Sequence, residues 1–451
     1  MIGLLPAKFK EALTKFKSDP EYRELISTSF FSLLVRMIGT GTGFLVTLVT
    51  SRYFGAGALG VVSICLAILI FAANFGKLGL DVALMRFVAE FALKKSFAAI
   101  KGTYLSALKL IIPVTLALSF LLFFTADWMA GTLFHKPYLA PILRINAWLT
   151  MPLVLLLIHS ECVRGLKKVR SYTFFQTAAV STIALALLIA AFFSGKVHMY
   201  IPVYVQFISI AVAGLLSFFN WSRYSKFREN KAEFVISPSA LMKVSAPMFT
   251  TTVMQLIMSW AGTLILAAYS TEADVGVYNA LVRISVFTNI TYLAINSISM
   301  PRFAQAFASE DKTALMRNAH EAARLILLTS LPLFFVLALF PKSILDVFGK
   351  EFPGNEISLY VLLAGQFIVI LSGLSGQILN MTGKQAILRN IAIFSALVNV
   401  SGCFILIPSF GILGVCVAQS LGMLVWNVAC VLAVKRHFGF YTFIFKRNRT
   451  E

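Results

Sequence analysis

Long apolar runs, separated by short polar or charged stretches, recur along the whole chain of 451 residues. Each run approaches the roughly 20 residues that an α-helix needs to cross the hydrocarbon core of a bilayer. This pattern predicts about twelve transmembrane helices, at 25–53, 58–80, 102–126, 140–163, 172–194, 198–220, 240–268, 276–300, 322–341, 357–380, 386–408 and 411–434. The predicted fold class is therefore all-α, a polytopic membrane protein.

The amino-acid composition supports the same class of protein. Hydrophobic residues make up 59% of the chain and charged residues only 13%, with a mean hydropathy of +0.84. A soluble domain carries about 25% charged residues. The five cysteines lie in or beside apolar segments and form neither a metal-binding spacing nor a disulfide framework, so we expect them to be packed. No metal or other cofactor is predicted.

A positive charge lies inside the first predicted helix. Arg36 sits about a third of the way along it, where an arginine costs roughly 2.5–3.5 kcal/mol on insertion scales. Polar and small residues recur at steps of three or four and form one stripe on this helix: Ser29, Ser32, Arg36, Thr40, Gly43, Thr47 and Thr50. A helix-packing seam at Gly39, Gly41 and Gly43 would explain the small residues but gives no reason for the arginine. We therefore expect the stripe to line a wet cavity.

The basic residues are distributed unevenly between the two sides of the membrane. With the N-terminus inside, 28 of the 39 Lys and Arg residues fall in cytoplasmic segments, five in outer loops and six within or at the edge of the membrane. This asymmetry follows the positive-inside rule, so both termini are predicted to be cytoplasmic, in a cell inner membrane. The rule also accounts for the net charge of +20, so no nucleic-acid partner is implied.

The two halves of the chain are related by an internal repeat. After a shift of 216 residues without a gap, Gly60 aligns with Gly276, and the Arg-Phe pair at 86–87 aligns with the one at 302–303. Because each half has an even number of helices, both halves have the same orientation, and the substrate path of such transporters lies between them. The predicted parts are a basic amphipathic lead, a six-helix N-lobe, a linker, a six-helix C-lobe and a basic tail, at 1–24, 25–220, 221–239, 240–434 and 435–451.

The repeat allows polar faces to be compared between the lobes. The second helix carries Asn74 and Lys77 on one face. The seventh helix repeats the first, with Thr252 in the place of Arg36 and with Gln255 on the same stripe. Both lobes are therefore expected to turn polar faces toward the centre.

The eighth predicted helix carries two polar faces. Asn279 and Arg283 lie on the face that corresponds to the polar face of the second helix. A second stripe, on nearly the opposite side, comprises Tyr278, Ser285, Asn289, Tyr292, Asn296 and Ser299. Only one face can point straight at the central axis, and we expect Arg283 to line the cavity.

Most other ionisable residues near the membrane have a partner close in sequence. Lys77 and Asp81 are four residues apart and Glu161 and Arg164 are three apart, which predicts mutual neutralisation. Asp81, Glu161 and His159 are the candidates for coupling to protons or ions. For a lone histidine near a helix end, a simple hydrogen-bonded role is the commoner alternative.

Arg36 and Arg283 have no acidic residue one turn away. These guanidinium groups need an anion from elsewhere, and their two parallel donors suit phosphate or pyrophosphate. The predicted substrate-binding residues are Arg36, Arg283, Lys77, Asn74, Thr40, Thr252, Gln255 and Asn279. The sequence contains no nucleophile–base constellation and no phosphate-cradling loop followed by lysine, so no enzymatic activity is predicted.

Four short motifs resemble those of one known family. They are Ser-Arg-Tyr-Phe-Gly-Ala-Gly-Ala-Leu-Gly-Val at 51–61, Gly-Leu-Asp-Val-Ala-Leu-Met-Arg-Phe-Val-Ala-Glu-Phe at 79–91, Ala-Asp-Val-Gly-Val-Tyr at 273–278 and Ile-Pro-Ser-Phe-Gly-Ile-Leu-Gly-Val at 407–415. From about 25 to 435 the chain resembles the polysaccharide or O-antigen flippases of the multidrug/oligosaccharidyl-lipid/polysaccharide (MOP) exporter superfamily. The resemblance implies two six-helix lobes around a V-shaped cavity. It also implies flipping of an undecaprenyl-pyrophosphate-linked oligosaccharide from the inner to the outer leaflet by alternating access.

The resemblance has further implications for residues and partners. In related lipid II flippases, arginines on the first and eighth helices hold the pyrophosphate, and Arg36 and Arg283 stand on those helices here. Those relatives have more helices than are predicted for this chain. The implied partners are the lipid-linked oligosaccharide and the bilayer, with a polysaccharide polymerase and a chain-length regulator as protein partners of a monomer.

Two alternative functions predict different features. A cation-coupled multidrug exporter of the same superfamily would need a buried carboxylate and an anionic or apolar cavity, whereas the mid-membrane charges here are positive. A membrane polysaccharide polymerase or ligase would need a large outer loop, and the longest one predicted has only about 15 residues, around 342–356. A flippase is therefore the expected function, with proton antiport, sodium antiport and the membrane potential as alternative energy sources.

Overall fold

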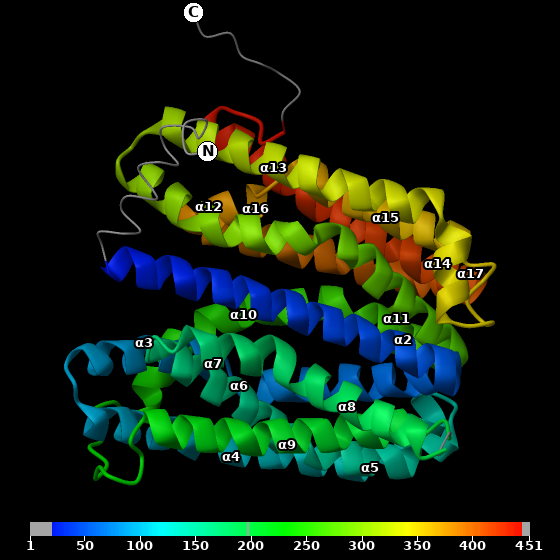
Figure 1. The fold of residues 1–451 in the computed structure, drawn as a ribbon, viewed down its shortest axis with the longest axis horizontal. Helices are drawn as coiled ribbons and strands as arrows, with labels where there is room; N and C mark the ends of the chain where they lie inside the picture. The colour runs from blue at the N-terminus through cyan, green and yellow to red at the C-terminus, as the bar shows by residue number, and fades with distance from the viewer. Residues whose placement is uncertain (1–19, 196–197, 444–451) are drawn as a thin grey trace, which may run out of the picture.

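The computed structural model of the chain describes residues 20–195 and 198–443. Within these residues the fold is a bundle of helices without strands (Figure 1). The N-terminal half contains α2 (Pro20–Gly76), α3 (Leu80–Leu93), α4 (Phe97–Trp128), η1 (Met129–Leu133), η2 (Pro137–Leu139), α5 (Ala140–Trp148), α6 (Thr150–Gly165), α7 (Val169–Thr173), η3 (Phe174–Ala178), α8 (Ala179–Phe193) and α9 (Ile201–Tyr224). Most of the predicted lead, the end of the basic tail and the side chains of Ser29 and Ser32 lie outside the described residues.

The C-terminal half is built in the same way. It contains α10 (Pro238–Tyr269), α11 (Glu272–Val286), η4 (Phe287–Asn289), α12 (Ile290–Ala308), α13 (Lys312–Leu339), α14 (Pro341–Phe348), α15 (Glu356–Ser372), α16 (Ser375–Met381) and α17 (Gln385–Phe438). Figure 1 shows α12 to α17 of this half lying above the helices α4 to α9 of the N-terminal half, with α2, α10 and α11 between them.

Two of the helices are hairpins. α2 has 57 residues and α17 has 54, and at 1.5 Å per residue each would be about 80 Å long, far more than the roughly 30 Å of a bilayer core. Each contains a glycine with non-helical backbone angles, Gly55 (φ 90°, ψ 162°) in α2 and Gly411 (φ 52°, ψ −123°) in α17. Glycine adopts positive φ at little cost, so the chain reverses direction at these two positions. α2 thus supplies the first two predicted crossings and α17 the last two.

The number of crossings agrees with the sequence prediction. Among the described residues, eight helices are long and apolar enough to cross a membrane, or nine if α15 and α16, bent by 48°, form one span. Two of these are the hairpins, each of which supplies two crossings. The predicted crossing at 276–300 corresponds to α11, η4 and α12, where the 3-10 turn divides the span into two shorter helices. The chain is therefore a multi-pass membrane protein with the predicted all-α, two-lobed fold.

Several predicted helices are broken rather than straight. The helix predicted at 58–80 ends at Gly76, and Leu78 (φ 53°) and Gly79 (φ 69°) separate it from α3. The helix predicted at 172–194 contains the π-helical turn η3, and the one predicted at 276–300 contains the 3-10 turn η4. Apolar periodicity reports which residues are buried, not how the backbone hydrogen bonds run. These breaks therefore left no signal in the pattern.

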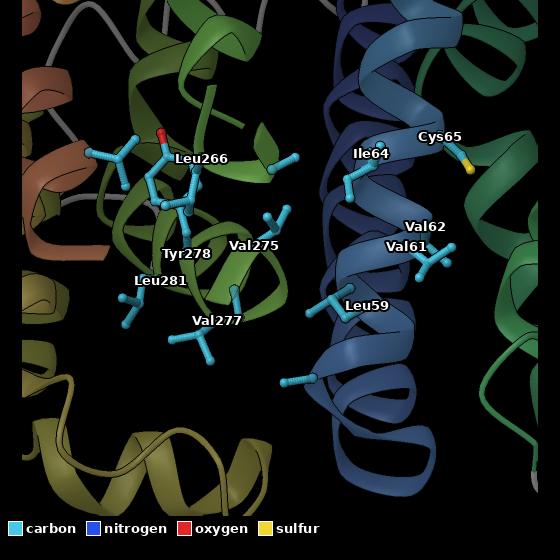
Figure 2. Close-up of a cluster of buried hydrophobic side chains, with 14 of the residues drawn as sticks. Leu59, Val61, Val62, Ile64, Cys65, Leu266, Val275, Val277, Tyr278 and Leu281 are labelled. Carbon is cyan, nitrogen blue, oxygen red and sulfur yellow. The ribbon is translucent and has the colours of Figure 1, made fainter. Parts of the chain in front are cut away.

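The buried residues form two separate cores at one end of the bundle and a shared core at the other. We name the end where Pro20 and Phe443 lie the proximal end, and the end where Gly55 and Gly411 lie the distal end. One proximal core draws on residues between 73 and 241, and the other on residues between 303 and 440. The distal core combines both halves, and Figure 2 shows part of it between α2 and the pair α10 and α11. The lobes therefore share one core distally, whereas proximally the cores are distinct and α10 of the C-lobe packs against the N-lobe.

The 216-residue repeat is visible where α2 and α11 cross. A methyl group placed on Gly60 would lie 1.7 Å from the carbonyl oxygen of Glu272, and one on Gly276 would lie 2.0 Å from that of Ala56. Glu272 is the repeat equivalent of Ala56, so each contact is the image of the other under the 216-residue shift. This symmetry fits the predicted relation of two lobes about an axis along the membrane normal.

Candidate functional site

The polar stripe of α2 is most accessible toward its proximal end. Arg36 and Thr40 are half-buried, whereas Gly43, Thr47 and Thr50 are buried. The Thr47 hydroxyl donates a hydrogen bond of 3.1 Å to the carbonyl oxygen of Gly43, so it is satisfied within the helix. The charged part of the stripe is therefore the part that a ligand can reach from the proximal end.

Arg283 of α11 reaches across the lobe boundary to the same stripe. A methyl group on Gly43 would lie 3.5 Å from Nη2 of Arg283 and 3.6 Å from Oγ of Ser181 on α8. The Arg283 side chain is nevertheless exposed, so α2 contacts it without covering it. Gly43 lies two turns, or about 10 Å, from Arg36 along α2. We name Arg36, Thr40, Gly43, Ser181 and Arg283 together the arginine site.

Neither arginine of this site has a counter-ion in the part of the chain that the structure describes. No hydrogen bond or ion pair joins Arg36 or Arg283 to another described residue. A cation within a membrane-spanning segment is costly unless it finds a partner. The arginine site therefore favours the binding of an anion.

The second polar stripe of the eighth predicted helix faces the interior of the C-lobe. Tyr278 and Ser285 are buried, and the Asn289 side-chain amide donates a hydrogen bond to Oε1 of Gln366 on α15. These side chains are thus used in packing the lobe. Arg283, on the opposite side of α11, is the polar group that meets α2, and its lining of the cavity stays a prediction.

Lys77 and Asp81 form a nearly buried ion pair between α2 and α3. The Lys77 ammonium lies 2.6 Å from the Asp81 carboxylate, and the two side chains are only 10% and 13% exposed. Asn74, one turn earlier, is half-buried and donates its side-chain amide to the carbonyl oxygen of Ile70 at 2.8 Å. The charge of Lys77 is therefore neutralised by a neighbour, as the spacing predicted, whereas the charges of the two arginines are not.

Replacing Asp81 with asparagine is expected to destabilise the protein, because the ammonium of Lys77 would remain buried without a counter-ion. Removing one partner of a buried pair costs about 3–5 kcal/mol, so the thermal denaturation midpoint in detergent should fall clearly. Glu90→Gln is the matched control, because the Glu90–Lys94 pair has the same spacing and a distance of 2.8 Å but is 48% and 62% exposed. The double variant Lys77→Met/Asp81→Leu should recover the midpoint. Equal midpoints for Asp81→Asn and Glu90→Gln would contradict this expectation.

Glu161 and His159 lie in α6, inside the N-lobe. Glu161 accepts a hydrogen bond of 3.3 Å from Arg164, the predicted partner. His159 is 1% exposed, and its two ring nitrogens lie 2.8 Å from the Tyr104 hydroxyl and 2.9 Å from the Ser217 hydroxyl. Both nitrogens of the histidine therefore have uncharged partners. Coupling of Asp81, Glu161 or His159 to protons or ions stays a prediction.

The remaining predicted residues lie on α10 and α11. Thr252 is half-buried and Gln255 is exposed. Asn279 is half-buried, donates to the carbonyl oxygen of Val275 at 2.9 Å and accepts from the Thr263 hydroxyl at 3.3 Å. The amide of Asn279 is thus engaged within the C-lobe, whereas Gln255 is accessible.

Ser181 belongs to the arginine site although it is not among the residues predicted from the sequence. It follows the π-helical turn η3, a type of turn that is often found at functional sites. At this turn the fifth predicted helix lies close to α2, since a methyl group on Gly39 would be 2.7 Å from the carbonyl oxygen of Thr177. Thr173, Thr177 and Ser181 follow one another at steps of four, so the sequence carries a periodic signal, but this signal does not say which helix the stripe will face. Only the crossing of the two helices brings it beside Arg283.

These observations define a helical, two-lobed membrane protein with two cations at the junction of its lobes, and comparisons with known proteins give its family. Residues 25–307 match the family model described as "Polysaccharide biosynthesis protein", and residues 247–405 match the model described as "MatE". The chain belongs to the polysaccharide biosynthesis protein family. The resemblance to the MOP exporter superfamily that its motifs indicated is confirmed.

Three relatives illustrate how far the likeness extends. The chain is 30% identical over 177 residues to the probable low-salt glycan biosynthesis flippase Agl15 of Haloferax volcanii, a match that spans 38% of this chain and only 36% of that protein. Its fold matches the inward-facing conformation of a multidrug resistance MATE family transporter of the MOP superfamily, with a TM-score of 0.75, 14% identity and coverage of 90% of this chain and 98% of the other. It also matches the lipid II flippase MurJ in an inward closed conformation, with a TM-score of 0.73, 16% identity and coverage of 90% and 87%. At these identities the two structures establish the fold.

Proposed function

We propose that this protein transports a polyprenyl-pyrophosphate-linked oligosaccharide, such as an O-antigen or another surface-polysaccharide repeat unit, from the inner to the outer leaflet. The observation that carries the proposal is the pair of guanidinium groups without described counter-ions, one from each lobe, at the same face of α2. Pyrophosphate is the anion that such planar, paired donors hold well. The polysaccharide biosynthesis family and the glycan flippase relative support the same substrate class.

The two arginines act at successive depths. Arg36 stands nearer the proximal end and receives the pyrophosphate first, and Arg283 holds it about 10 Å deeper, at the level of Gly43. The sugars contact the hydroxyl and amide groups of Thr40, Asn74, Thr252, Gln255 and Asn279. Lys77 takes part only when it exchanges the carboxylate of Asp81 for the phosphate. No covalent step is needed, because the lipid changes sides without changing its bonds.

The lipid tail stays in the bilayer on the side of α2 that α12 faces. On the other side the proximal part of α10 packs against the N-lobe. The rings of Phe75 and Phe249 lie 5.5 Å apart, and a methyl group on Gly79 would be 3.1 Å from the carbonyl oxygen of Ser245. Between the described residues, α12 makes no comparable contact with α2. This asymmetry supports a lateral opening between α2 and α12.

The transport cycle is a rocking of the N-lobe, residues 25–220, against the C-lobe, residues 240–434, with 221–239 as the linker. The protein works as a monomer in the cytoplasmic membrane, with both termini in the cytoplasm and the proximal end facing it. A polysaccharide polymerase and a chain-length regulator use its product. Asp81, Glu161 or His159 couples the cycle to protons or ions. Export of cationic drugs, the alternative within the superfamily, is disfavoured because the arginine site would repel them.

Purified full-length protein in proteoliposomes tests the substrate class directly. Vesicles carrying undecaprenyl-pyrophosphate oligosaccharide in the inner leaflet are expected to expose the sugar to an external lectin only when the protein is present. Empty vesicles and vesicles with the Arg36→Ala variant are the controls. Uptake or release of a cationic dye without any lectin-accessible sugar would contradict the flippase and favour the drug exporter.

A further inference from the structure

The distal end of the lobe junction is closed by direct contact between main chains. Methyl groups placed on Gly60 and Gly276 would lie only 1.7 Å and 2.0 Å from carbonyl oxygens of the opposite lobe. No side chain fits in such a space, so two helix backbones touch here as they do at small-residue crossings in membranes. Apolar residues of both lobes pack around the crossing (Figure 2). The lobes therefore meet here without an aqueous path between them.

Two hydrogen bonds fasten the turn of the α2 hairpin to the C-lobe. The Arg52 guanidinium donates to the carbonyl oxygen of Asp346 at 2.8 Å. The backbone N–H of Ala56 donates to Oε2 of Glu351 at 2.5 Å. Both bonds join a side chain of one lobe to the main chain of the other.

A third attachment comes from Lys136, which precedes η2 in the N-lobe and is 8% exposed. Its ammonium donates to the carbonyl oxygens of Ala267 and Ser270, at 2.8 Å each, where α10 ends in the C-lobe. Burial lowers the pKa of Lys136, and the carboxylates of Glu272 and Asp274 oppose this shift. Those carboxylates thus help to keep the buried ammonium charged and its hydrogen bonds strong.

The contact of the two glycines lies directly distal to the arginine site. Gly276 precedes Arg283 by seven residues, which is two turns or about 10 Å of α11. Arg52, Lys136 and Glu351 make their bonds across the lobes to main-chain groups rather than to opposite charges. When the lobes part, each charged group returns to water, and no ion pair between described residues has to be broken, although Lys136 moves away from the carboxylates of Glu272 and Asp274. The hydrogen bonds of the distal contact can therefore break and re-form when the lobes move apart and together.

We propose that the crossing of Gly60 and Gly276 is the distal gate of the transporter, and that Arg52, Lys136 and Glu351 latch it shut. The gate rests on the proposed function only for the identity of the cargo that passes through it. Because a methyl group cannot fit at either glycine, alanine there holds the gate apart. In these alanine variants, a larger share of the protein molecules then adopts the state that is open at the distal end.

The test measures access to the arginine site from the distal face without any substrate. Ser181→Cys provides a thiol beside Arg283, and the five native cysteines are all buried. Full-length protein in membrane vesicles is treated with a membrane-impermeant maleimide from one face at a time, and Ser194→Cys, exposed after α8, identifies the distal face. Gly60→Ala and Gly276→Ala are each expected to raise distal labelling of Ser181→Cys roughly tenfold.

Gly57→Ala is the matched control, because a methyl group there would lie 3.6 Å from the flexible Cγ of Glu272, an ordinary contact. Equal distal labelling in well-folded Gly60→Ala and Gly57→Ala proteins would overturn the gate. If Gly60→Ala does not elute as a single species, the Lys136→Met variant provides the test, because it removes the hydrogen bonds of Lys136 without adding bulk. Unchanged distal labelling in this variant would overturn the proposal. The labelling experiment needs no lipid-linked sugar. A negative flipping assay would therefore not contradict the proposed gate, and negative labelling would not contradict the proposed flippase function.

Discussion

Alanine at position 36 is expected to abolish surface polysaccharide in a strain that lacks the chromosomal copy of the gene, with lipid-linked intermediates accumulating on the inner leaflet. Arg36 is half-buried on the polar stripe of α2 and has no counter-ion among the described residues. Each hydrogen bond to a charged group contributes about 1.5–3 kcal/mol. Loss of a two-pronged phosphate contact should therefore lower transport by at least about 100-fold.

Two further variants separate the charge of Arg36 from its geometry. Arg36→Lys keeps the charge but loses the planar pair of donors, so we expect transport between that of the wild type and that of Arg36→Ala. Arg144→Ala is the matched control, because the Arg144 side chain is 43% exposed and already has a counter-ion in Asp127. Protein amounts in the membrane are compared by immunoblot. Normal surface glycan with Arg36→Ala would exclude the anion-binding role.

Alanine at position 283 is expected to stop flipping while leaving the first binding step largely intact. Arg283 meets α2 at Gly43, about 10 Å deeper than Arg36, so the pyrophosphate reaches it only after leaving the proximal end. Binding of undecaprenyl pyrophosphate to the detergent-solubilised protein should thus weaken strongly in Arg36→Ala and only slightly in Arg283→Ala. Flipping in proteoliposomes should fall in both, by roughly 10- to 100-fold.

The opposite face of α11 provides the control for Arg283. Ser285 is buried and donates within its own helix to the carbonyl oxygen of Val282 at 2.9 Å. Ser285→Ala is therefore expected to flip lipid at nearly the wild-type rate. Loss of flipping in Ser285→Ala, together with normal flipping in Arg283→Ala, would mean that the substrate contacts the other face of the helix.

The two arginines of the site could be found in the sequence for a simple reason. A cation inside an apolar run is so costly that few purposes other than ligand binding explain it, and Arg36 is recognisable from its neighbours alone. Arg283 was harder to assign, because its helix carries a second polar stripe. The hydrogen bond from Asn289 to Gln366 engages that stripe in the C-lobe, and no helical wheel contains this information.

Asp81, the partner of Lys77, and Ser181 show what residue spacing in a sequence can and cannot predict. The spacing of Lys77 and Asp81 indicated their ion pair, because four residues of helix bring side chains together. The structure adds that the pair bridges a helix break and is nearly buried, and this burial determines how much the pair affects the stability of the protein. Ser181 shares a stripe with Thr177, but nothing local relates it to Arg283, since it joins the arginine site only through the close approach of two helices.

The sequence by itself determined the all-α fold class, the number of crossings and the repeat, because hydropathy, length and internal similarity are local properties of the chain. It also predicted two cations within the membrane, Arg36 and Arg283, that have no acidic residue one turn away. Only the tertiary structure decided that α2 and α17 are hairpins, that Arg283 meets α2 at Gly43, and that Gly60 and Gly276 bring the lobes into backbone contact. These features depend on distances between residues far apart in the chain, and the identity of a residue does not specify which distant residue it will touch.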